Sequence, residues 1–407
     1  MCHAPIVVPT VGRDEARHCL RTTRAMREIA ARVVEARPDR IVLLSPHSPR
    51  RHGSWGAWAG PRHRGDLGAF RAPEIAVDLP DASEVNAALG LPTISAAPLD
   101  HGAMVPLAFL WEAGWRGATA ILALPWEDEP WDPALGSRIA RLDGRTAVIA
   151  SGDMSHRLKR GAPAGYHPEA ASFDRAFVSA LERHDWTALR DLPHRADAAE
   201  DVVTSTRSAQ TTVDGPRGDE VLSYEGPWGV GYTEAILFDE RPALYAVARR
   251  AVRAHLRGEP VETSKPGAGA PGVFVTLYEG TALKGCVGHV DERPSEDLHA
   301  AIADVAIAAA TRDPRFDPLT LEQLADLVFE VSLLSEQRPL TDRATHDPKA
   351  RGLVVEAGRR RGILLPDVDT IDSIDEQERV CRNKAGLSPS EPARLSWFTV
   401  EKVSQPT

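Results

Sequence analysis

Cysteine is scarce in this chain, and long apolar runs and blocks of basic residues are missing altogether. The four cysteines among 407 residues are scattered and none forms a CxxC pair, which argues against a cysteine-based zinc cluster and a disulfide framework. No run of 18 apolar residues occurs, so no membrane-spanning helix is expected. The first residues show no charged region followed by an apolar core and a cleavage site, so no secretory signal is expected either.

Charge and composition favour a cytoplasmic globular protein. The net charge is -10 and the isoelectric point is about 5.8, and without a basic block the chain is not expected to bind nucleic acid. Hydrophobic residues make up 43% and charged residues 26% of the chain, as is usual for globular proteins. The length of 407 residues predicts about two or three domains with sizeable cores.

Apolar patterns in the first half predict alternating strands and helices. Residues 40–44 (RIVLL) form a continuous run that is typical of a strand buried on both faces of a sheet. Further strands are expected at 75–79, 118–124 and 145–151, with helices at 14–36, 103–113, 132–142, 168–184 and near 197–213. This alternation predicts an α/β fold in which helices cover both faces of the sheet, an α/β/α sandwich.

Two stretches of this first part break the alternation. Residues 49–73 are rich in glycine, arginine, tryptophan and histidine, and are expected to form a long functional loop or lid. Residues 221–232 (VLSYEGPWGVGY) predict a strand, a glycine-rich bend and a closing strand. The first domain is expected to end near residue 240.

The second part of the chain is again a mixture of helices and strands, which predicts a smaller α+β domain. The two domains are expected to span 1–240 and 241–407. A helix at 243–257 leads into the proline- and glycine-rich stretch 258–272, which is predicted to be a flexible loop. Beyond it, strands are expected at 273–278, 327–334, 353–357 and 362–365, and helices at 296–311 and 372–386.

Four histidines stand in short polar breaks where strands end or loops begin: His3, His47, His101 and His156. Open α/β sheets gather their ligands at the edge where strands end, so a metal site is the first hypothesis. A single histidine of this kind would more often be a capping or surface residue. His3 and His47 lie beside prolines that stiffen their loops and are the candidate imidazole ligands. Two imidazoles and one carboxylate on one face of an octahedral Fe(II) leave three positions for substrate and O2.

Five stretches of the first 238 residues resemble the class III extradiol ring-cleavage dioxygenases, in particular their Memo-like branch. They are His3–Pro9, Ser45–His47, Asp100–Leu107, Gly152–His156 and Tyr224–Tyr232. Each stretch is short, but together they occur in the order of that family. The resemblance implies the family's α/β fold, Fe(II) as cofactor, and a small catechol-like aromatic and O2 as substrates.

The resemblance also implies a ligand set for the iron. His3 and His47 match the two iron-binding histidines of the family. The third ligand there is a glutamate at the start of a later helix, and Glu200 is the best match by order and by its distance from the fourth motif. Glu225 is the runner-up, although it better suits a structural role at a strand end. Asp201 could also serve as the carboxylate ligand.

Proton chemistry falls to the other two histidines if the resemblance holds. His156 matches the acid–base histidine, which takes a proton from the incoming phenol and later donates one as the O–O bond breaks. His101 matches a second active-site histidine, which contacts the substrate or dioxygen. The expected active site therefore contains four histidines and one carboxylate.

Five stretches of the second part resemble the AMMECR-type domain. They are 272–277, 283–289, 312–319, 361–366 and 395–400. Within them, Cys286 is expected to be a small buried residue rather than a reactive thiol. Residues 312–316 (RDPRF) are expected to form a local salt-bridge staple rather than an anion site. The fusion resembles the AmmeMemoRadiSam group, whose members often accompany a radical S-adenosylmethionine enzyme, and such an enzyme is an expected partner.

Three functions stay open from the sequence. The first is an Fe(II)-dependent extradiol dioxygenase. The second is a hydrolase that holds zinc in the same pocket, because zinc competes well for nitrogen and oxygen donors. The third is a binding protein without catalysis, and residues 201–207 (DVVTSTR) favour it because they are more polar than the Cys-Gly and apolar helix of many relatives. Open sheets of this kind commonly pair, so a homodimer is also expected.

Overall fold

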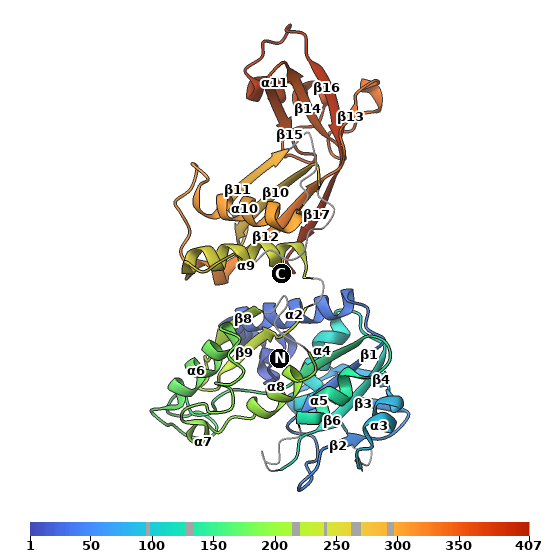
Figure 1. Ribbon diagram of the computed structural model, residues 1–407, viewed down its shortest axis with the longest axis vertical. Coiled ribbons are helices and arrows are strands. Elements are labelled where there is room, and N and C mark those ends of the chain that lie inside the picture. The colour runs from blue at the N-terminus through green and yellow to red at the C-terminus, as the bar shows by residue number, and fades with distance from the viewer. Residues whose placement is uncertain are drawn as a thin grey trace. The chain divides into compact units, whose positions relative to one another are not determined.

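The computed structural model describes residues 1–94, 98–126, 133–213, 220–239, 242–261, 270–290 and 297–406 (Figure 1). The chain forms two compact units, Met1–Arg241 and Pro242–Gln405. The domain boundary expected at residue 240, and residues 262–269 of the flexible loop expected at 258–272, lie outside the described residues. Within the described ranges, no helix has both the length and the apolar character that crossing a membrane requires.

A five-stranded sheet lies at the centre of the first unit. Its order is β5 (Thr93–Ile94), β2 (Gly56–Trp58), β6 (Ala118–Ala123), β1 (Arg40–Ser45) and β7 (Thr146–Ala150). β1 runs parallel to both neighbours, with Leu44 opposite Leu122 on one side and Ala150 on the other. β2 runs antiparallel to β6. The carboxyl ends of β6, β1 and β7 therefore meet at one edge of the sheet.

Helices cover both faces of this sheet because β1 is apolar on both. Ile41 and Leu43 belong to one core, and Val42 and Leu44 to the other; all four side chains are fully buried. The first core includes α2 (Leu20–Glu35) and α4 (His101–Glu112), and the second includes α3 (Ser83–Leu89), α5 (Pro133–Ala140) and α8 (Val203–Gln210). Each such burial contributes about 1.5–3 kcal/mol. The expected α/β class is confirmed.

The first long helix is shorter than its periodicity indicates. The stretch 14–36 divides into a 3-10 helix, η2 (Arg13–Cys19), and α2. At the junction, the carboxylate of Glu225 accepts hydrogen bonds from the main-chain N–H and the hydroxyl of Thr22, at 2.8 and 2.9 Å. A carboxylate at this point satisfies an otherwise unpaired amide and interacts favourably with the helix dipole, so α2 begins there.

The stretch 49–73, expected to be a loop or lid, contains regular structure instead. Besides β2, it holds β3 (Arg62–Leu67), which pairs antiparallel with β4 (Ala72–Pro80) through the short helical turn η3 (Gly68–Phe70). Only two of the six residues of β3 are buried, so the charged residues between them conceal the alternation of the strand. This two-stranded sheet packs against α4.

The remaining elements of the first unit follow the sequence patterns in part. They are η1 (Pro5–Val7), α1 (Pro9–Gly12), α6 (Ala170–Glu182), α7 (Arg195–Ala198), β8 (Glu220–Glu225) and β9 (Tyr232–Ile236). β8 and β9 form the hairpin expected around 221–232. The polar helix expected near 197–213 is divided into α7 and α8, because Ala199 between them takes a left-handed conformation with a φ of 55°.

Two four-stranded sheets form the second unit. One has the order β11 (Ala282–Val290), β10 (Gly272–Glu279), β12 (Leu327–Leu334), β17 (Val400–Ser404). The other has the order β13 (Arg338–Pro339), β16 (Arg394–Phe398), β14 (Gly352–Ala357), β15 (Arg360–Leu364). The helical segments are α9 (Leu244–Arg257), α10 (Leu298–Thr311), η4 (Gln323–Asp326), η5 (Arg343–Thr345) and α11 (Ile374–Ala385). α9 and α10 pack on the first sheet and α11 on the second. The strands β11, β13, β16 and β17 were not expected from the sequence.

The RDPRF stretch fastens the turn after α10 to β11. Asp313 accepts a hydrogen bond from the main-chain N–H of Cys286 at 2.9 Å, and Arg315 donates one to the carbonyl of Cys286 at 2.9 Å. Arg315 and Asp313 pair with each other at 2.7 Å. The stretch is a salt-bridge staple, as its composition indicates, and Cys286 is half-buried rather than buried.

Candidate metal centre

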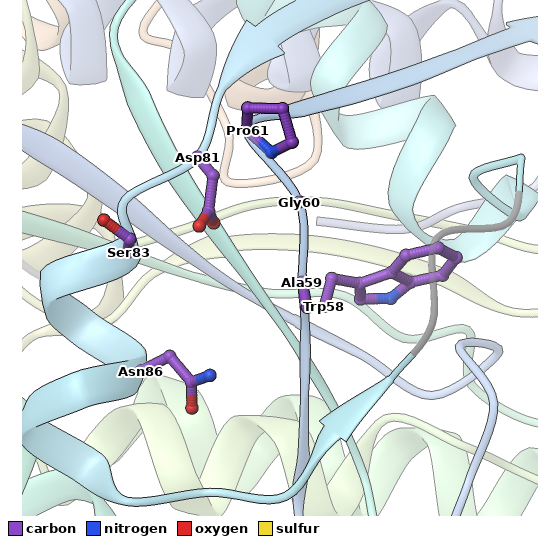
Figure 2. Close-up of a pocket in the computed structure, with 7 residues that line it drawn as sticks. All are labelled: Trp58, Ala59, Gly60, Pro61, Asp81, Ser83 and Asn86. Carbon is purple, nitrogen blue, oxygen red and sulfur yellow. The ribbon is translucent and has the colours of Figure 1, made fainter.

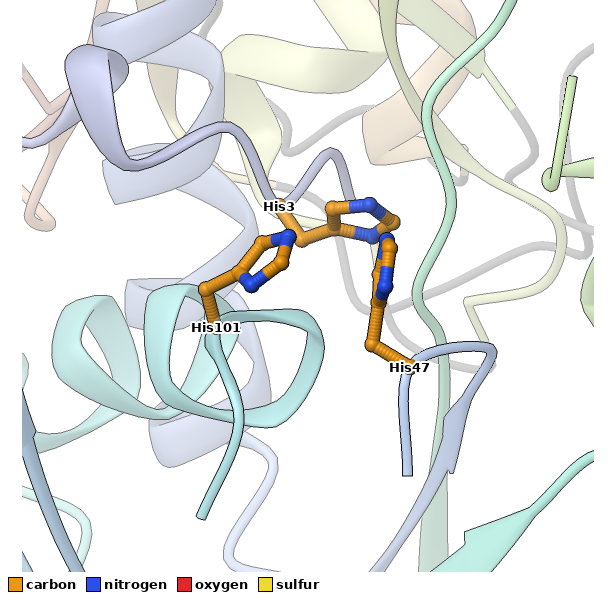
Figure 3. Close-up of side chains that lie close together, drawn as sticks. All are labelled: His3, His47 and His101. Carbon is orange, nitrogen blue, oxygen red and sulfur yellow. The ribbon is translucent and has the colours of Figure 1, made fainter. Parts of the chain in front are cut away.

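Three histidines from separate segments gather at the carboxyl edge of the central sheet (Figure 3). His3 precedes η1, His47 lies two residues beyond the end of β1, and His101 is the first residue of α4. Each offers a ring nitrogen, and these nitrogens all lie within 4.8 Å of one another. Two ligands at about 2.1 Å from one ion are at most about 4.2 Å apart, so the cluster is close to the size that one ion requires.

The loop that carries His47 and the helix that carries His101 are tied together by Asp100. Its carboxylate caps α4 by accepting the N–H of Ala103 at 3.1 Å. The same carboxylate accepts the hydroxyl of Ser48 at 3.0 Å. A single carboxylate thus sets the relative positions of two of the three imidazoles.

His3 is fully buried, and Ser151 fixes the orientation of its ring. The hydroxyl of Ser151 donates its one proton to the carbonyl of Gly102 at 2.6 Å, so its oxygen accepts from Nδ1 of His3 at 3.1 Å. In the neutral imidazole, Nε2 is then the unprotonated nitrogen. Nε2 is buried and has no hydrogen-bond partner among the described residues, which is the condition expected of a metal ligand.

Asp201 brings a carboxylate to these histidines. Its Oδ2 lies 3.2 Å from Nε2 of His47 and 3.5 Å from Nε2 of His3. Its Oδ1 accepts the main-chain N–H of Asp153 at 2.7 Å, which orients the group. Two imidazole nitrogens and one carboxylate oxygen therefore face a common point.

Glu200, the expected carboxylate ligand, is committed to other partners. One of its oxygens accepts the guanidinium Nε of Arg195 at 2.7 Å, and the other accepts the N–H groups of Val202 and Val203 at 2.7 and 2.8 Å. These contacts close the first turn of α8. The structure therefore places Asp201, and not Glu200, beside the histidines, because one oxygen of Glu200 is held at the start of α8 and the other by Arg195.

Two more residues considered for the site lie outside the histidine cluster. Glu225 caps α2 at Thr22, which is the structural role that suits a strand-end carboxylate. His156 follows β7, and its main-chain N–H donates to the carbonyl of Ala198 at 3.0 Å. Its ring is not one of the three that come within 4.8 Å of one another in the described part of the chain.

Buried carboxylates give the site a negative potential. Burial alone would lower the pKa of His3, but the charges of Asp153 and Asp201 outweigh it and raise that pKa to about 9. Burial opposes ionisation of Asp201, yet the adjacent histidines and the hydrogen bond from Asp153 hold its pKa well below the usual range. Burial and the neighbouring imidazoles lower the pKa of His101 to about 4. The site thus attracts positive charge to His3, either a proton or a metal ion, while His101 stays neutral.

The donor set fits a divalent metal. Two histidines and one carboxylate are the ligands of non-haem Fe(II) sites that use O2. The same nitrogen and oxygen donors also suit Zn(II). With His3, His47 and Asp201 as ligands, His101 stands beside them, its ring centroid 4.2 Å from that of His47.

Asp153 and Ser151 support the site, although neither was expected there from the sequence. Asp153 accepts the main-chain N–H of His3 at 2.9 Å, and Ser151 holds the ring of the same residue. Both follow β7 directly. Polar residues immediately after a continuous apolar strand of a parallel sheet are the signal that would have identified them.

A separate pocket of about 450 Å³ lies between the connection from β2 to β3 and the start of α3 (Figure 2). Its lining consists of Trp58, Ala59, Gly60, Pro61, Asp81, Ser83 and Asn86. None of the three clustered histidines contributes to it. The pocket is therefore not part of the candidate metal centre.

Two protein families match the chain over consecutive ranges. Residues 1–205 match the family described as the catalytic LigB subunit of aromatic ring-opening dioxygenase. Residues 245–403 match the AMMECR1 family. The first match spans the histidine cluster and Asp201, and the second spans most of the second unit.

Relatives match either nearly the whole chain or about a third of it. A protein of Clostridium acetobutylicum is 27% identical, over 98% of this chain and 97% of its own length. A protein of Thermotoga maritima is 42% identical, over 35% of this chain and 81% of its own. Among solved structures, an uncharacterized protein from Pyrococcus horikoshii is 32% identical, with 40% of this chain and 91% of that chain covered and a TM-score of 0.36.

Proposed function

Since the chain belongs to the family of the catalytic LigB subunit of aromatic ring-opening dioxygenase and carries an AMMECR1 domain behind it, we propose that its first unit is an Fe(II)-dependent oxidoreductase. The proposed reaction is extradiol cleavage, in which the ring of a catechol-like aromatic opens beside its two hydroxyl groups and both atoms of O2 enter the product. The observation that supports this most directly is the convergence of His3, His47 and Asp201. The Nε2 atoms of His47 and His3 lie 3.2 and 3.5 Å from the same carboxylate oxygen of Asp201.

Each residue of the centre has a defined task in this proposal. Fe(II), when bound, supplies a template for the catecholate and O2 and a path for electrons between them. His3, His47 and Asp201 hold the ion, and Asp153 keeps the carboxylate aimed through its main-chain N–H. His101 stands beside the ligands, where its ring can hydrogen-bond a substrate oxygen or bound dioxygen.

In the proposed reaction His156 is the proton carrier, which takes the proton of the phenol and later returns it. Its Nδ1 is buried and has no hydrogen-bond partner among the described residues. A proton taken from the phenol has to return to the product, and an imidazole nitrogen without another partner among the described residues can both accept and deliver it.

The first experiment measures metal and O2 consumption together. Full-length protein is purified anaerobically, its metals are determined by elemental analysis, and O2 uptake is recorded with a panel of catechols. Near-stoichiometric iron and catechol-dependent O2 uptake are expected, and His47→Ala should lose both. His18→Ala, which removes an exposed histidine of η2, is the matched control and should keep both. Iron-loaded protein without any catechol-dependent O2 uptake would contradict the proposal.

A zinc-dependent hydrolase is the second candidate, and the third imidazole favours it. His101 stands close enough to join His3 and His47 around a small ion, and three nitrogen ligands leave the fourth position of tetrahedral zinc open for a water. Zinc would lower the pKa of a bound water and so prepare it for attack on an ester or amide. Stoichiometric zinc in protein purified from metal-replete cells, without O2 uptake, would favour this candidate.

The partners expected from the sequence stay proposals. They are a radical S-adenosylmethionine enzyme and a second copy of the chain. Co-purification from the native organism tests the first, and sedimentation equilibrium tests the second.

A further inference from the structure

Phe70 places an exposed aromatic ring against the candidate metal centre. It ends η3, at the tip of the hairpin formed by β3 and β4. Its ring centroid lies 5.8 Å from that of His101, with the two planes at 69°. Despite this contact, 38% of Phe70 is exposed to solvent. An aromatic ring left half-open beside polar imidazoles leaves apolar surface in water that a ligand could cover.

The tip of this hairpin is held in place by contacts on both sides of Phe70. Leu67 and Ala72, which flank the turn, are buried in the core with α4. The N–H of Arg71 donates to the carbonyl of Gly68 at 2.9 Å, and the N–H of Gly68 donates to the carboxylate of Asp66 at 2.7 Å. The ring of Phe70 is therefore presented by a turn that is anchored at both ends.

The backbone at the tip is also unusual for its sequence. Arg71 has a φ of 65°, in the left-handed region that residues with a side chain rarely adopt. A Cβ added to Gly68 would lie 2.7 Å from the carboxylate of Asp66, so a side chain there would displace this carboxylate. A disfavoured conformation persists where the surroundings impose it, and such positions gather at ligand sites.

We propose that Phe70 is a specificity-determining residue, which packs against the ring of a planar aromatic ligand bound at the metal centre. The inference rests on the proposed function, because it assumes that two oxygens of the ligand reach the metal held by His3 and His47. A flat ring bound in this way would cover the exposed surface of Phe70, and offset or edge-to-face contact between aromatic rings is favourable. A chelating ligand without a ring has no such contact.

The alternative is that Phe70 only shields His101 and holds the helix start in place. The two roles differ in what they do to ligands of different shape. A shielding role would affect all metal-binding ligands alike, or the stability of the fold. A role in specificity would affect aromatic ligands alone.

The test compares two chelating probes on anaerobic, Fe(II)-loaded full-length protein. 4-Nitrocatechol carries an aromatic ring and acetohydroxamate does not, and both bind a metal through two oxygens. Binding of 4-nitrocatechol is followed by its absorbance, and acetohydroxamate is measured by competition with it. Phe70→Ala and Phe70→Leu are compared with the natural protein and with Leu20→Ala, which shortens an exposed apolar side chain of α2.

We expect both Phe70 variants to bind 4-nitrocatechol about three- to tenfold more weakly, as the loss of one aromatic contact predicts. Their iron content, their melting temperature and the Kd of acetohydroxamate should match those of the natural protein and of Leu20→Ala. Equal weakening of both probes, or no weakening of either, would overturn the role of Phe70. Failure of the iron-loaded natural protein to bind 4-nitrocatechol at all would overturn the proposed function as well, which distinguishes the two results.

Discussion

The main-chain N–H of Asp153 donates a hydrogen bond to Oδ1 of Asp201 at 2.7 Å, and this contact determines which carboxylate reaches the histidines. The other oxygen of Asp201 then faces Nε2 of His47 at 3.2 Å. Asp153 itself accepts the main-chain N–H of His3. One aspartate thus positions both the carboxylate that faces the histidines and the segment that carries His3.

Replacing Glu200 and Asp201 one at a time should show which carboxylate binds the metal and which one only caps α8. Asp201→Ala is expected to lower bound iron at least about tenfold, because it removes the only carboxylate oxygen that faces both histidines in the described part of the chain. Glu200→Gln is the matched control, and it should leave the iron content unchanged. Elemental analysis after anaerobic Fe(II) loading measures both. Strong iron loss in Glu200→Gln with none in Asp201→Ala would return the ligand to Glu200.

Removal of the cap on α2 should cost stability and leave the metal in place. Glu225→Ala leaves the N–H of Thr22 without its partner and is expected to lower the free energy of unfolding by about 1–2 kcal/mol. Urea denaturation measures this change. Glu35→Ala, at the exposed end of the same helix, is the control and should shift stability by less than about 0.5 kcal/mol. A loss of iron in Glu225→Ala without a loss of stability would show that this residue is a ligand.

Glu234 on β9 predicts how stability depends on pH. Its side chain is fully buried, and burial raises its pKa to about 7 although Ser223 donates a hydrogen bond to it. In the unfolded chain its pKa is close to the ordinary 4.5. Between these two values the folded state binds more protons than the unfolded state, so the free energy of unfolding falls as the pH rises. The loss is at most about 1.4 kcal/mol for each pH unit in this window.

Glu234→Gln isolates this contribution, because glutamine keeps an acceptor for Ser223 but does not titrate. The stability of the variant relative to the natural protein should rise between about pH 4.5 and 7 and level off above that range. Urea unfolding at a series of pH values measures the difference. A difference that stays constant with pH would contradict the predicted titration.

The two imidazoles assigned to catalysis should affect turnover but not metal binding. His101→Ala and His156→Ala are each expected to lower kcat about 100-fold or more, as the loss of a hydrogen bond to the reacting oxygens and the loss of a general acid–base group predict. Iron content is the control, and it should remain near that of the natural protein. Full ring-cleaving activity in His156→Ala would remove this residue from the mechanism. Loss of iron in His101→Ala would make it a ligand instead.

Local patterns of residues sufficed for most of the central architecture. The run at 40–44 is apolar at each position after Arg40. A strand in a sheet that is covered on both faces needs apolar side chains on both of its sides, and this run is observed as the buried strand β1. The strand β3 was not predicted, since its exposed positions carry arginine and aspartate and its alternation is visible only against α4. The hairpin tip that carries Phe70 could not be predicted for the same reason.

The sequence by itself determined that histidines stand at strand ends, and from this it predicted a metal site at one edge of an α/β sheet. It placed His3, His47 and His101 in short polar breaks, and parallel strands with a common edge bring such breaks together. Only the tertiary structure decided which of Glu200 and Asp201 lies beside the histidines. These neighbours have the same charge and nearly the same shape, and what separates them is a main-chain N–H of Asp153, 48 residues away, which no local pattern encodes.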